Sequence, residues 1–493
     1  VGAVGSGVPQ QRAAAEISKG VAKGGFLFQA HARSFDDYNS PAGEVFNSGA
    51  ADRGFLARGE HQVGRGILSL SWQSDFGRDI ERPRTNSRTV RFVYPVEDSH
   101  RIGAAYDLRQ AGGFERIVLS AFGGRYRQMT DQDRFATASK GRSLERADYA
   151  ADDFQIRGTA ERLAGNARVE FGVDVNGRVG VRATDTVRQY GLTGAVTSDV
   201  VTLSIDNARR IDAGAYATLE AALVPGAIVG AGIRADRVST RNIGGYFGDW
   251  STAHGALSGS ASLAVGLGKG LSLTGQIGTG FRDPTVSDRY YRGPTGRGFI
   301  TGNPDLDPER SIQLDAGLRY TSARVRAGLS AFQYRINDLI ERYSTSTDYF
   351  FFRNRGRARV RGVEAELHAS LPGGLELEAT GALTRGLALD DRTALDDMPP
   401  ATITAGLRRA VASRGYVRVR GAFFAKDDRP GPTEIVMPGY TLLDALGGVS
   451  LSNSLDLNLS IRNLLDRTYP VSPDARAVLA PGLHGVLTIA ARF

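Results

Sequence analysis

Side chains that could bind a ligand are concentrated in one long segment between residues 283 and 309. Guanidinium groups and aromatic rings attract anionic, partly aromatic molecules through charge and through cation–π contacts. The residues of this segment that carry these groups are Arg289, Tyr290, Tyr291, Arg292, Arg297 and Phe299. Weaker candidates of the same kind are Arg82, Arg84, Tyr343, Tyr349 and the aromatic run 350–352. The sequence therefore predicts a binding site that depends chiefly on segment 283–309.

No catalytic or metal-binding constellation is found in the sequence. The six histidines are scattered, and no two of them have metal-ligand spacing. The chain has no cysteine, which excludes disulfides and thiolate metal sites. It also lacks a nucleophile elbow, a phosphate loop and a His-Glu-x-x-His motif. We therefore predict that the protein is not an enzyme and holds neither a metal nor a cofactor.

Alternating apolar and polar residues indicate the elements that position these side chains. In segment 310–320 the apolar residues are Ile312, Leu314, Ala316, Leu318 and Tyr320, with mostly polar residues between them. Segments 416–425 and 455–462 alternate in the same way. Successive side chains of a strand point to opposite faces, whereas a helix needs apolar residues three and four apart. The chain is therefore predicted to be all-β, with no helical segment.

The connections between these strands alternate between short and long. Short turns are predicted at 224–226, 268–270, 372–374 and 452–454. Long connections are predicted near 35–51, 77–97, 129–150, 185–209, 241–252, 283–309, 389–399, 428–438 and 466–481. This asymmetry is typical of a transmembrane antiparallel β-barrel with short periplasmic turns and long extracellular loops. We predict about 20–22 strands, with the barrel over residues 21–493 and an incomplete N-terminal segment, 1–20, contributing part of the first hairpin.

The net charge of +8 comes from arginines that are spread through nearly every segment. A protein that binds nucleic acid usually clusters its basic residues, so nucleic acid is not an expected partner. Barrels of this size have a wide lumen that side chains cannot fill. We therefore expect the arginines to line a polar lumen or to contact the anionic membrane surface, with lipopolysaccharide as a partner.

Three longer motifs go beyond periodicity: GFRDPTVSDRYY at 280–291, GNPDLDPERSIQLDAGLRY at 302–320, and NLLDRTYP at 463–470 followed by PGLHGVLTIAARF from 481 to the end. Together they resemble the C-terminal barrel of TonB-dependent outer-membrane receptors. The segment RNRGRARVRGVEAEL at 353–367 also resembles a pattern of this family. By this resemblance Leu487, Ile489 and Phe493 would form the membrane-assembly signal. The shared parity of Arg359, Arg361 and Val363 additionally predicts a bulge near Gly362.

The resemblance implies an outer-membrane receptor of a Gram-negative bacterium that takes up a scarce, large nutrient. Metal chelates, such as an iron–siderophore complex or cobalamin, are the common cargo, and the TonB complex drives import through a plug domain. No plug or TonB box is found in this sequence, so we expect it upstream or on a separate chain. The alternative is a plugless or split-chain barrel that acts as a pore or scaffold with partner proteins.

A second interpretation of segment 283–309 stays open at this stage. Tyr290 and Tyr291 could belong to the aromatic belt at the membrane interface, and the arginines could contact phosphates of lipopolysaccharide. The sequence does not decide between this role and ligand binding.

Overall fold

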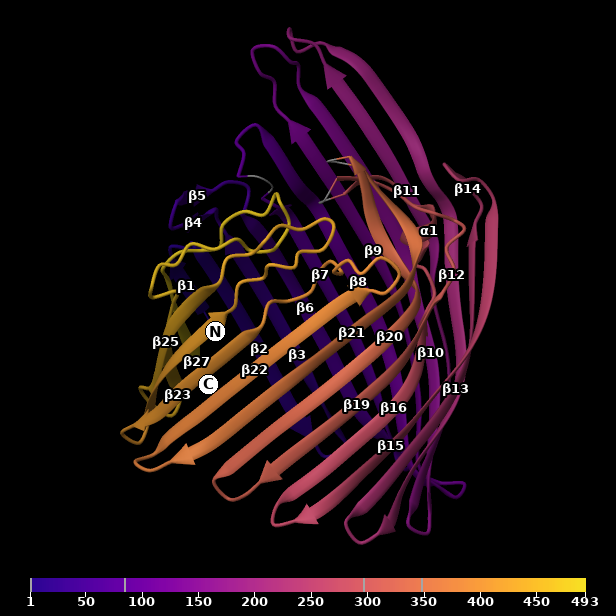
Figure 1. Ribbon diagram of the computed structural model, residues 1–493, viewed down its shortest axis with the longest axis vertical. Coiled ribbons are helices and arrows are strands. Elements are labelled where there is room, and N and C mark those ends of the chain that lie inside the picture. Colours follow the sequence, from indigo (N-terminus) through magenta and orange to yellow (C-terminus); the bar gives the residue numbers. More distant parts are fainter. Residues whose placement is uncertain (1, 84–85, 296–297, 347–348) are drawn as a thin grey trace.

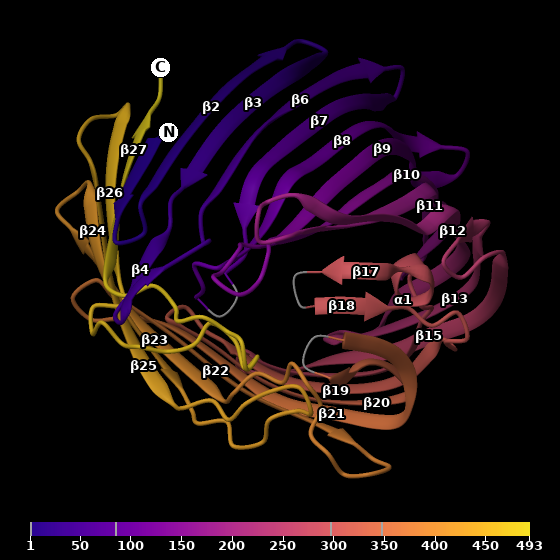
Figure 2. The ribbon, with the colours of Figure 1, turned by 90° about the horizontal axis from the view of Figure 1, so that it is seen from above.

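A computed structural model describes residues 2–83, 86–295, 298–346 and 349–493, and most of these residues form one 25-stranded sheet. Three of its strands, β14, β17 and β18, lie in loops. The other 22 described strands pair antiparallel with their neighbours, and the circuit closes where β1 pairs with β27 (Figures 1 and 2). The predicted all-β barrel of about 20–22 strands is therefore confirmed.

The bounds of the strands follow the chain order around the barrel. The first half consists of β1 (Gly2–Ser6), β2 (Gln10–Val21), β3 (Gly24–Phe35), β6 (Ala50–Val63), β7 (Gly66–Glu81), β8 (Val90–Ala111), β9 (Phe114–Arg134), β10 (Ser143–Ala164), β11 (Ala167–Tyr190), β12 (Val196–Val224) and β13 (Ala227–Asn242). The second half consists of β15 (Trp250–Gly268), β16 (Leu271–Arg282), β19 (Glu309–Thr321), β20 (Val325–Ser346), β21 (Tyr349–Leu371), β22 (Leu375–Ala388), β23 (Thr402–Val411), β24 (Gly415–Phe424), β25 (Tyr440–Ser450), β26 (Leu455–Arg462) and β27 (His484–Ala491). The elements in loops are β4 (Tyr38–Ser40), β5 (Gly43–Val45), β14 (Gly244–Gly245), α1 (Val286–Tyr290), β17 (Arg292–Thr295) and β18 (Gly298–Thr301).

The strands have an apolar outer face and a polar inner face. Leu257 on β15 is 72% exposed, and Ile233 on the neighbouring β13 is also exposed. The opposite face of β13 carries Arg234, which bonds Asp236 and reaches across β12 to Asp174 of β11 at 2.8 Å. A Cβ atom at Gly214 of β12 would lie 2.1 Å from the Arg234 guanidinium, so the glycine makes this crossing possible. The alternation therefore separates a lipid-type surface from a hydrated lumen.

The strands extend further into the predicted long connections than the sequence indicated. β8, β9, β10 and β11 each have more than 20 residues, and β12 has 29. Most of segments 77–97, 129–150 and 185–209 is therefore strand rather than loop. Pairing beyond the membrane satisfies backbone N–H and C=O groups that an irregular loop would leave to water.

Two details of the prediction were wrong. First, the described residues contain one helix, α1, whose first turn has a capping box formed by Thr285 and Asp288. This helix is not long and apolar enough to cross a membrane. Second, β21 pairs with β20 and β22 without a register shift near Gly362. Arg359 and Arg361 share the parity of Val363 because all three face outward, and the outer surface changes from apolar to polar along the strand.

Replacing Leu257 with arginine is expected to destabilise the barrel by up to about 2–4 kcal/mol, because a charge would be placed on the apolar outer face. The free energy of unfolding in lipid vesicles, from urea titration, measures this effect. Leu192→Arg is the matched control, since Leu192 is similarly exposed, at 66%, in the loop between β11 and β12. Equal stability of both variants would show that water rather than lipid covers the outer face.

Candidate functional site

Segment 283–309 folds into the lumen of the barrel instead of extending outward. Seen from above, α1, β17 and β18 lie inside the ring of strands (Figure 2). Thr285 Oγ1 accepts from the backbone of Asp288, and Asp288 accepts from the backbone of Thr285, so both ends of this box are satisfied. Such reciprocal capping starts a helix even when only one turn follows.

Apolar contacts attach α1 to the barrel wall. Val286 and Tyr290 are buried against a wall cluster. The wall residues are Ala151, Val181, Ala183, Ile205 and Ala208, which come from β10, β11 and β12. Tyr291 packs against the same cluster, and its hydroxyl donates to the carbonyl of Pro294 at 2.8 Å. Burial raises the pKa of both tyrosines, so they stay neutral.

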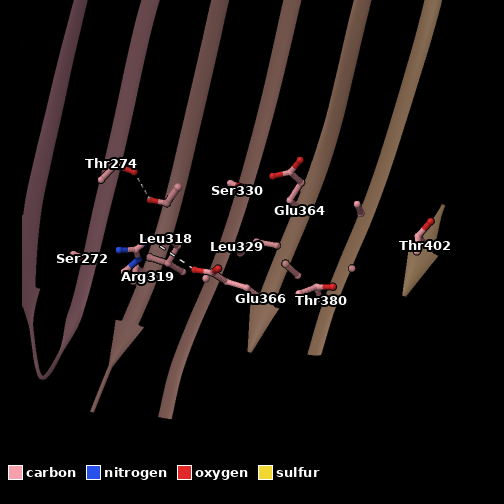
Figure 3. Close-up of a pocket in the computed structure, with 15 residues that line it drawn as sticks. Ser272, Thr274, Leu318, Arg319, Leu329, Ser330, Glu364, Glu366, Thr380 and Thr402 are labelled. Atoms are coloured by element: carbon pink, nitrogen blue, oxygen red, sulfur yellow. Dashed lines mark hydrogen bonds and ion pairs between the residues drawn. The ribbon is translucent and has the colours of Figure 1, made fainter. Parts of the chain in front are cut away.

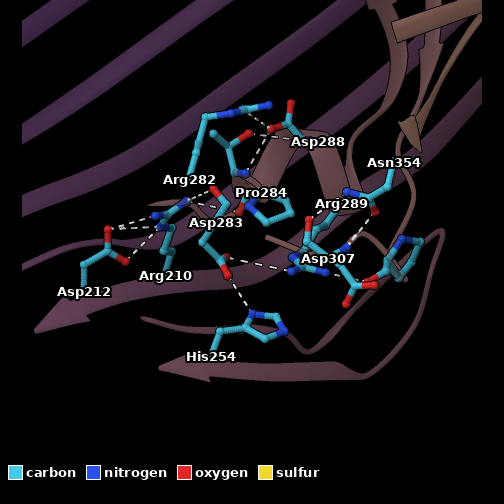
Figure 4. A network of polar contacts seen from close by, with 12 residues as sticks. Arg210, Asp212, His254, Arg282, Asp283, Pro284, Asp288, Arg289, Asp307 and Asn354 are labelled. Atoms are coloured by element: carbon cyan, nitrogen blue, oxygen red, sulfur yellow. Dashed lines mark hydrogen bonds and ion pairs between the residues drawn. The ribbon is translucent and has the colours of Figure 1, made fainter. Parts of the chain in front are cut away.

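Asp283 lies at the centre of a buried polar network that holds the start of the segment (Figure 4). Its Oδ2 is 2.6 Å from Nδ1 of His254, and its Oδ1 is 3.8 Å from Nη2 of Arg289. Arg210 donates to the backbone oxygens of Asp283 and Pro284 and pairs with Asp212. Asp283 therefore links the lumen segment to two strands of the wall, to β15 through its carboxylate and to β12 through its backbone carbonyl.

Arg289 is 1% exposed and closes this network from the helix side. Its Nη1 donates to the carbonyl of Pro304 at 2.7 Å, which joins α1 to the chain that leaves the lumen. Burial lowers the pKa of Arg289, and the charge of Asp283 opposes that shift. A buried charge needs pairing and hydrogen bonds; Arg289 has the pair with Asp283 and the bond from Nη1, whereas its Nε and Nη2 have no hydrogen-bond partner among the described residues.

The end of the segment is held by β19 and β21. Arg282 binds Glu309 at 2.7 Å and Asp288 at 3.4 Å. Asp307 and Asn354 exchange two hydrogen bonds between backbone and side chain. In addition, β18 pairs in parallel with the start of β21. These contacts fix both ends of the segment and place β17 and β18 across the lumen.

Asp185 of β11 lies beneath β17 and is almost fully buried. A Cβ atom at Gly293 would be 2.5 Å from both of its carboxylate oxygens, so the β17 backbone lies directly on this side chain. Its Oδ1 has no hydrogen-bond partner among the described residues. Burial raises the pKa of Asp185 to about 7, although the charge of Arg292 partly opposes this shift.

Arg292 and Phe299 of the segment form a cluster with two aromatic rings from other parts of the chain, Tyr246 and Tyr349. The guanidinium of Arg292 lies 4.4 Å from the ring centre of Tyr246 and 4.9 Å from that of Phe299. Phe299 in turn contacts Tyr349, with ring centres 5.7 Å apart. Tyr246 and Tyr349 are 52% and 53% exposed. We call these four residues the lumen cluster.

The wall below the lumen segment is polar. Arg319 and Glu366 point toward one another between β19 and β21, with 3.7 Å between their charged atoms (Figure 3). Thr274 donates to the carbonyl of Gly317 in the same region. In the part of the chain that the structure describes, no three His, Asp or Glu side chains are close enough to hold a metal ion.

The structure divides the predicted ligand residues into three groups. Arg289 and Tyr290 are buried and attach the segment to the wall, and Tyr291 packs beside them. Arg292 and Phe299 belong to the lumen cluster, together with the weaker candidate Tyr349. Arg84 and Arg297 lie outside the described residues.

Other predicted residues lie away from this cluster. Arg82 donates to the hydroxyl of Tyr94 at 3.0 Å, in the connection between β7 and β8. Leu487 and Ile489 are exposed on the outer face of β27, and Phe493 is exposed beyond its end. Sequence reasoning missed Tyr246 and Asp185, because they join the segment only through the fold. The helix, by contrast, could have been found from the spacing Thr285-x-x-Asp288.

These features define a class of protein: a large, closed membrane-type barrel whose lumen contains a folded segment with exposed binding groups. A family model described as "TonB dependent receptor-like, beta-barrel" matches residues 28–464. The chain belongs to this family.

A curated relative, the vitamin B12 transporter BtuB of Vibrio vulnificus (strain YJ016), is 27% identical over 227 residues. That match covers 44% of this chain and 34% of the transporter, so it spans about a third of the relative's length.

Solved structures show the same fold over the whole chain. The copper transporter OprC has a TM-score of 0.85 at 17% identity and is matched over 79% of its length. The FrpB iron transporter from Neisseria meningitidis (F3-3 variant) has a TM-score of 0.75 at 16% identity over 80% of its length. Both alignments cover 100% of this chain. The three proteins named here are transporters.

Proposed function

We propose that this chain is the barrel of an outer-membrane receptor that takes up a metal chelate in a Gram-negative bacterium. The family and the names of its relatives, which carry vitamin B12, copper and iron, support this class of cargo. The TonB complex supplies the energy for import, acting through a plug on the same or another chain. An iron–siderophore complex or a cobalamin is the cargo that we favour.

The observation that carries this proposal is the lumen cluster. Arg292 and the three rings around it are held at the long-loop end of the barrel by a segment fixed at both ends. A guanidinium between aromatic faces suits an anionic ligand with aromatic groups, such as a ferric catecholate. The cluster therefore offers a first contact for cargo arriving from outside.

Replacing Arg292 and Phe299 together with alanine is expected to weaken binding of the cargo by about tenfold or more. The measurement is a fluorescence titration of the purified full-length protein with a panel of ferric catecholate, cyanocobalamin, haem and Cu²⁺. The control is Arg12→Ala with Phe35→Ala, a cation–π pair elsewhere in the barrel whose guanidinium is 5.0 Å from the ring. If the double variant binds every ligand of the wild type with unchanged affinity, Arg292 and Phe299 have a structural role and do not bind the cargo.

Uptake by whole cells separates this receptor from the passive-pore alternative. We expect labelled cargo to accumulate only when TonB is present and the proton gradient is intact. Accumulation that is equal in cells with and without TonB would favour a pore or scaffold.

A further inference from the structure

A group of arginines on the outer face of β19–β22 is not used by the proposed uptake function. Arg310, Arg335, Arg359, Arg361 and Arg385 share the parity of exposed apolar residues on their own strands and therefore point away from the lumen. We call these five residues the outer arginine belt. They explain why the segment RARVR of β21 alternates basic residues with small or apolar ones.

The belt contains two pairs of like charges at directly opposed positions. Arg335 of β20 lies opposite Arg359 of β21, and Arg361 of β21 lies opposite Arg385 of β22. Like charges directly across two strands repel one another and destabilise the sheet unless an anion lies between them. This arrangement therefore calls for a negatively charged partner.

The protein itself does not supply that partner within the described residues. None of the five belt arginines has an ion pair there, and the nearby Asp390 binds Arg357. Several outward arginines on other strands are paired, as in Arg78 with Asp98 and Arg127 with Asp148. What distinguishes this sector, within the described part of the chain, is that five outward arginines without ion pairs lie on four adjacent strands, four of them in directly opposed pairs.

An apolar surface begins directly next to the belt on β19, β21 and β22 and a few residues further along on β20. Its exposed members include Leu314 of β19, Leu329 of β20, Val363 of β21 and Leu383 of β22. Val363 and Leu383 are each two residues from an arginine of the belt, so the boundary between the two surfaces is sharp. A ligand that fits both surfaces has a multiply charged anionic head and apolar chains.

We propose that the outer face of β19–β22 binds a phosphorylated lipid of the surrounding leaflet. Its phosphate groups lie between the opposed arginines, and its acyl chains lie along the apolar band. Guanidinium groups suit phosphates because they donate two parallel hydrogen bonds, and a phosphate between two arginines removes their repulsion. The inference rests on the membrane location in the proposed function but not on the identity of the cargo.

The test uses purified full-length protein in detergent and a fluorescent diphosphorylated glycolipid as the probe. Replacing Arg335, Arg359, Arg361 and Arg385 with glutamine is expected to lower the affinity by about tenfold or more. The control replaces Arg78, Arg125, Arg127 and Arg188, which already have aspartate partners, with glutamine and is expected to bind as the wild type does. Heat-dependent mobility on gels confirms that each variant is folded.

Further arms separate the possible sources of the anion. The dephosphorylated glycolipid and phosphatidylcholine vesicles are expected not to compete with the probe. Unchanged affinity in the belt variant, or an equal loss in the control variant, would overturn the proposal. Displacement of the probe by millimolar inorganic phosphate alone would also overturn it, since the site would then recognise an anion without its lipid. Cargo binding, measured on the same variants, is expected to be unchanged, so failure of either proposal is visible by itself.

Discussion

Replacing Arg289 with alanine is expected to release segment 283–309 from the lumen while the barrel remains closed. The side chain is fully buried, binds the carbonyl of Pro304 and lies beside the buried carboxylate of Asp283. Removing one partner of a buried ion pair leaves the other charge without compensation, which costs about 3–5 kcal/mol. The effect falls near the lower limit, because His254 still contacts Asp283.

Hydrogen exchange and limited proteolysis measure this release. In the variant, amides of 286–295 should exchange faster, and trypsin should cleave after Arg292, which the folded segment protects. Arg289→Lys should restore part of the protection, since it keeps a charge near Asp283. Arg324→Ala, at an exposed short turn between β19 and β20, is the control for a change of charge alone. Full protection of the segment in Arg289→Ala would show that the apolar contacts of Val286 and Tyr290 hold it without the ion pair.

The barrel could be predicted from the sequence because its pattern is local. Alternation in segments such as 310–320 depends only on which face of a strand meets lipid, and short turns such as 224–226 mark the strand ends. The lengths of β8–β12 were underestimated, since above the membrane both faces are polar and the alternation disappears. The same change from apolar to polar outward residues along β21 led to the incorrect prediction of a bulge near Gly362.

The candidate site could be predicted only in part. The composition of segment 283–309 indicated binding groups, and Arg292 and Phe299 are partly exposed, as that interpretation requires. Arg289 and Tyr290 have the same residue types but are buried. Tyr290 is buried against Val181 and Ile205, which lie about 100 residues earlier in the chain and meet α1 only when the barrel closes. Arg289 is buried where it contacts Asp283 and Pro304. Composition alone does not separate an arginine that faces the lumen from one that anchors the segment.

The attachment of the lumen segment is expected to weaken as pH rises, because of Asp185. At this height the outward residues of β11 are polar, including Arg182, Thr184 and Thr186, so Asp185 lies beyond the lipid band. Its pKa is raised from 3.8 to about 7 by burial beneath Gly293, with Arg292 as the opposing charge and Tyr291 neutral nearby. When the segment leaves, water reaches the carboxylate and its pKa returns toward the ordinary value.

The protonated form of Asp185 is favoured while the segment is in place, so the attachment is stronger at low pH. The stabilising contribution is fully present below about pH 4 and is lost as pH rises through about 7. A difference of three pKa units corresponds to at most about 4 kcal/mol in the free energy of attachment. Hydrogen exchange of residues 286–295, corrected for the intrinsic pH dependence of exchange, should therefore show less protection at pH 8 than at pH 5.

Asp185→Asn isolates this contribution from other titrating groups such as His254. The amide has the size of the protonated acid and does not ionise, so the variant should keep strong protection at pH 8 and have a flatter pH profile than the wild type. Asp199→Asn is the matched control, because Asp199 binds Arg188 on an exposed surface and has no contact with the segment. If the wild type and Asp185→Asn lose protection in parallel between pH 5 and pH 8, another group controls the attachment. If only the wild type loses it, the buried carboxylate beneath β17 makes the accessibility of the lumen depend on external pH.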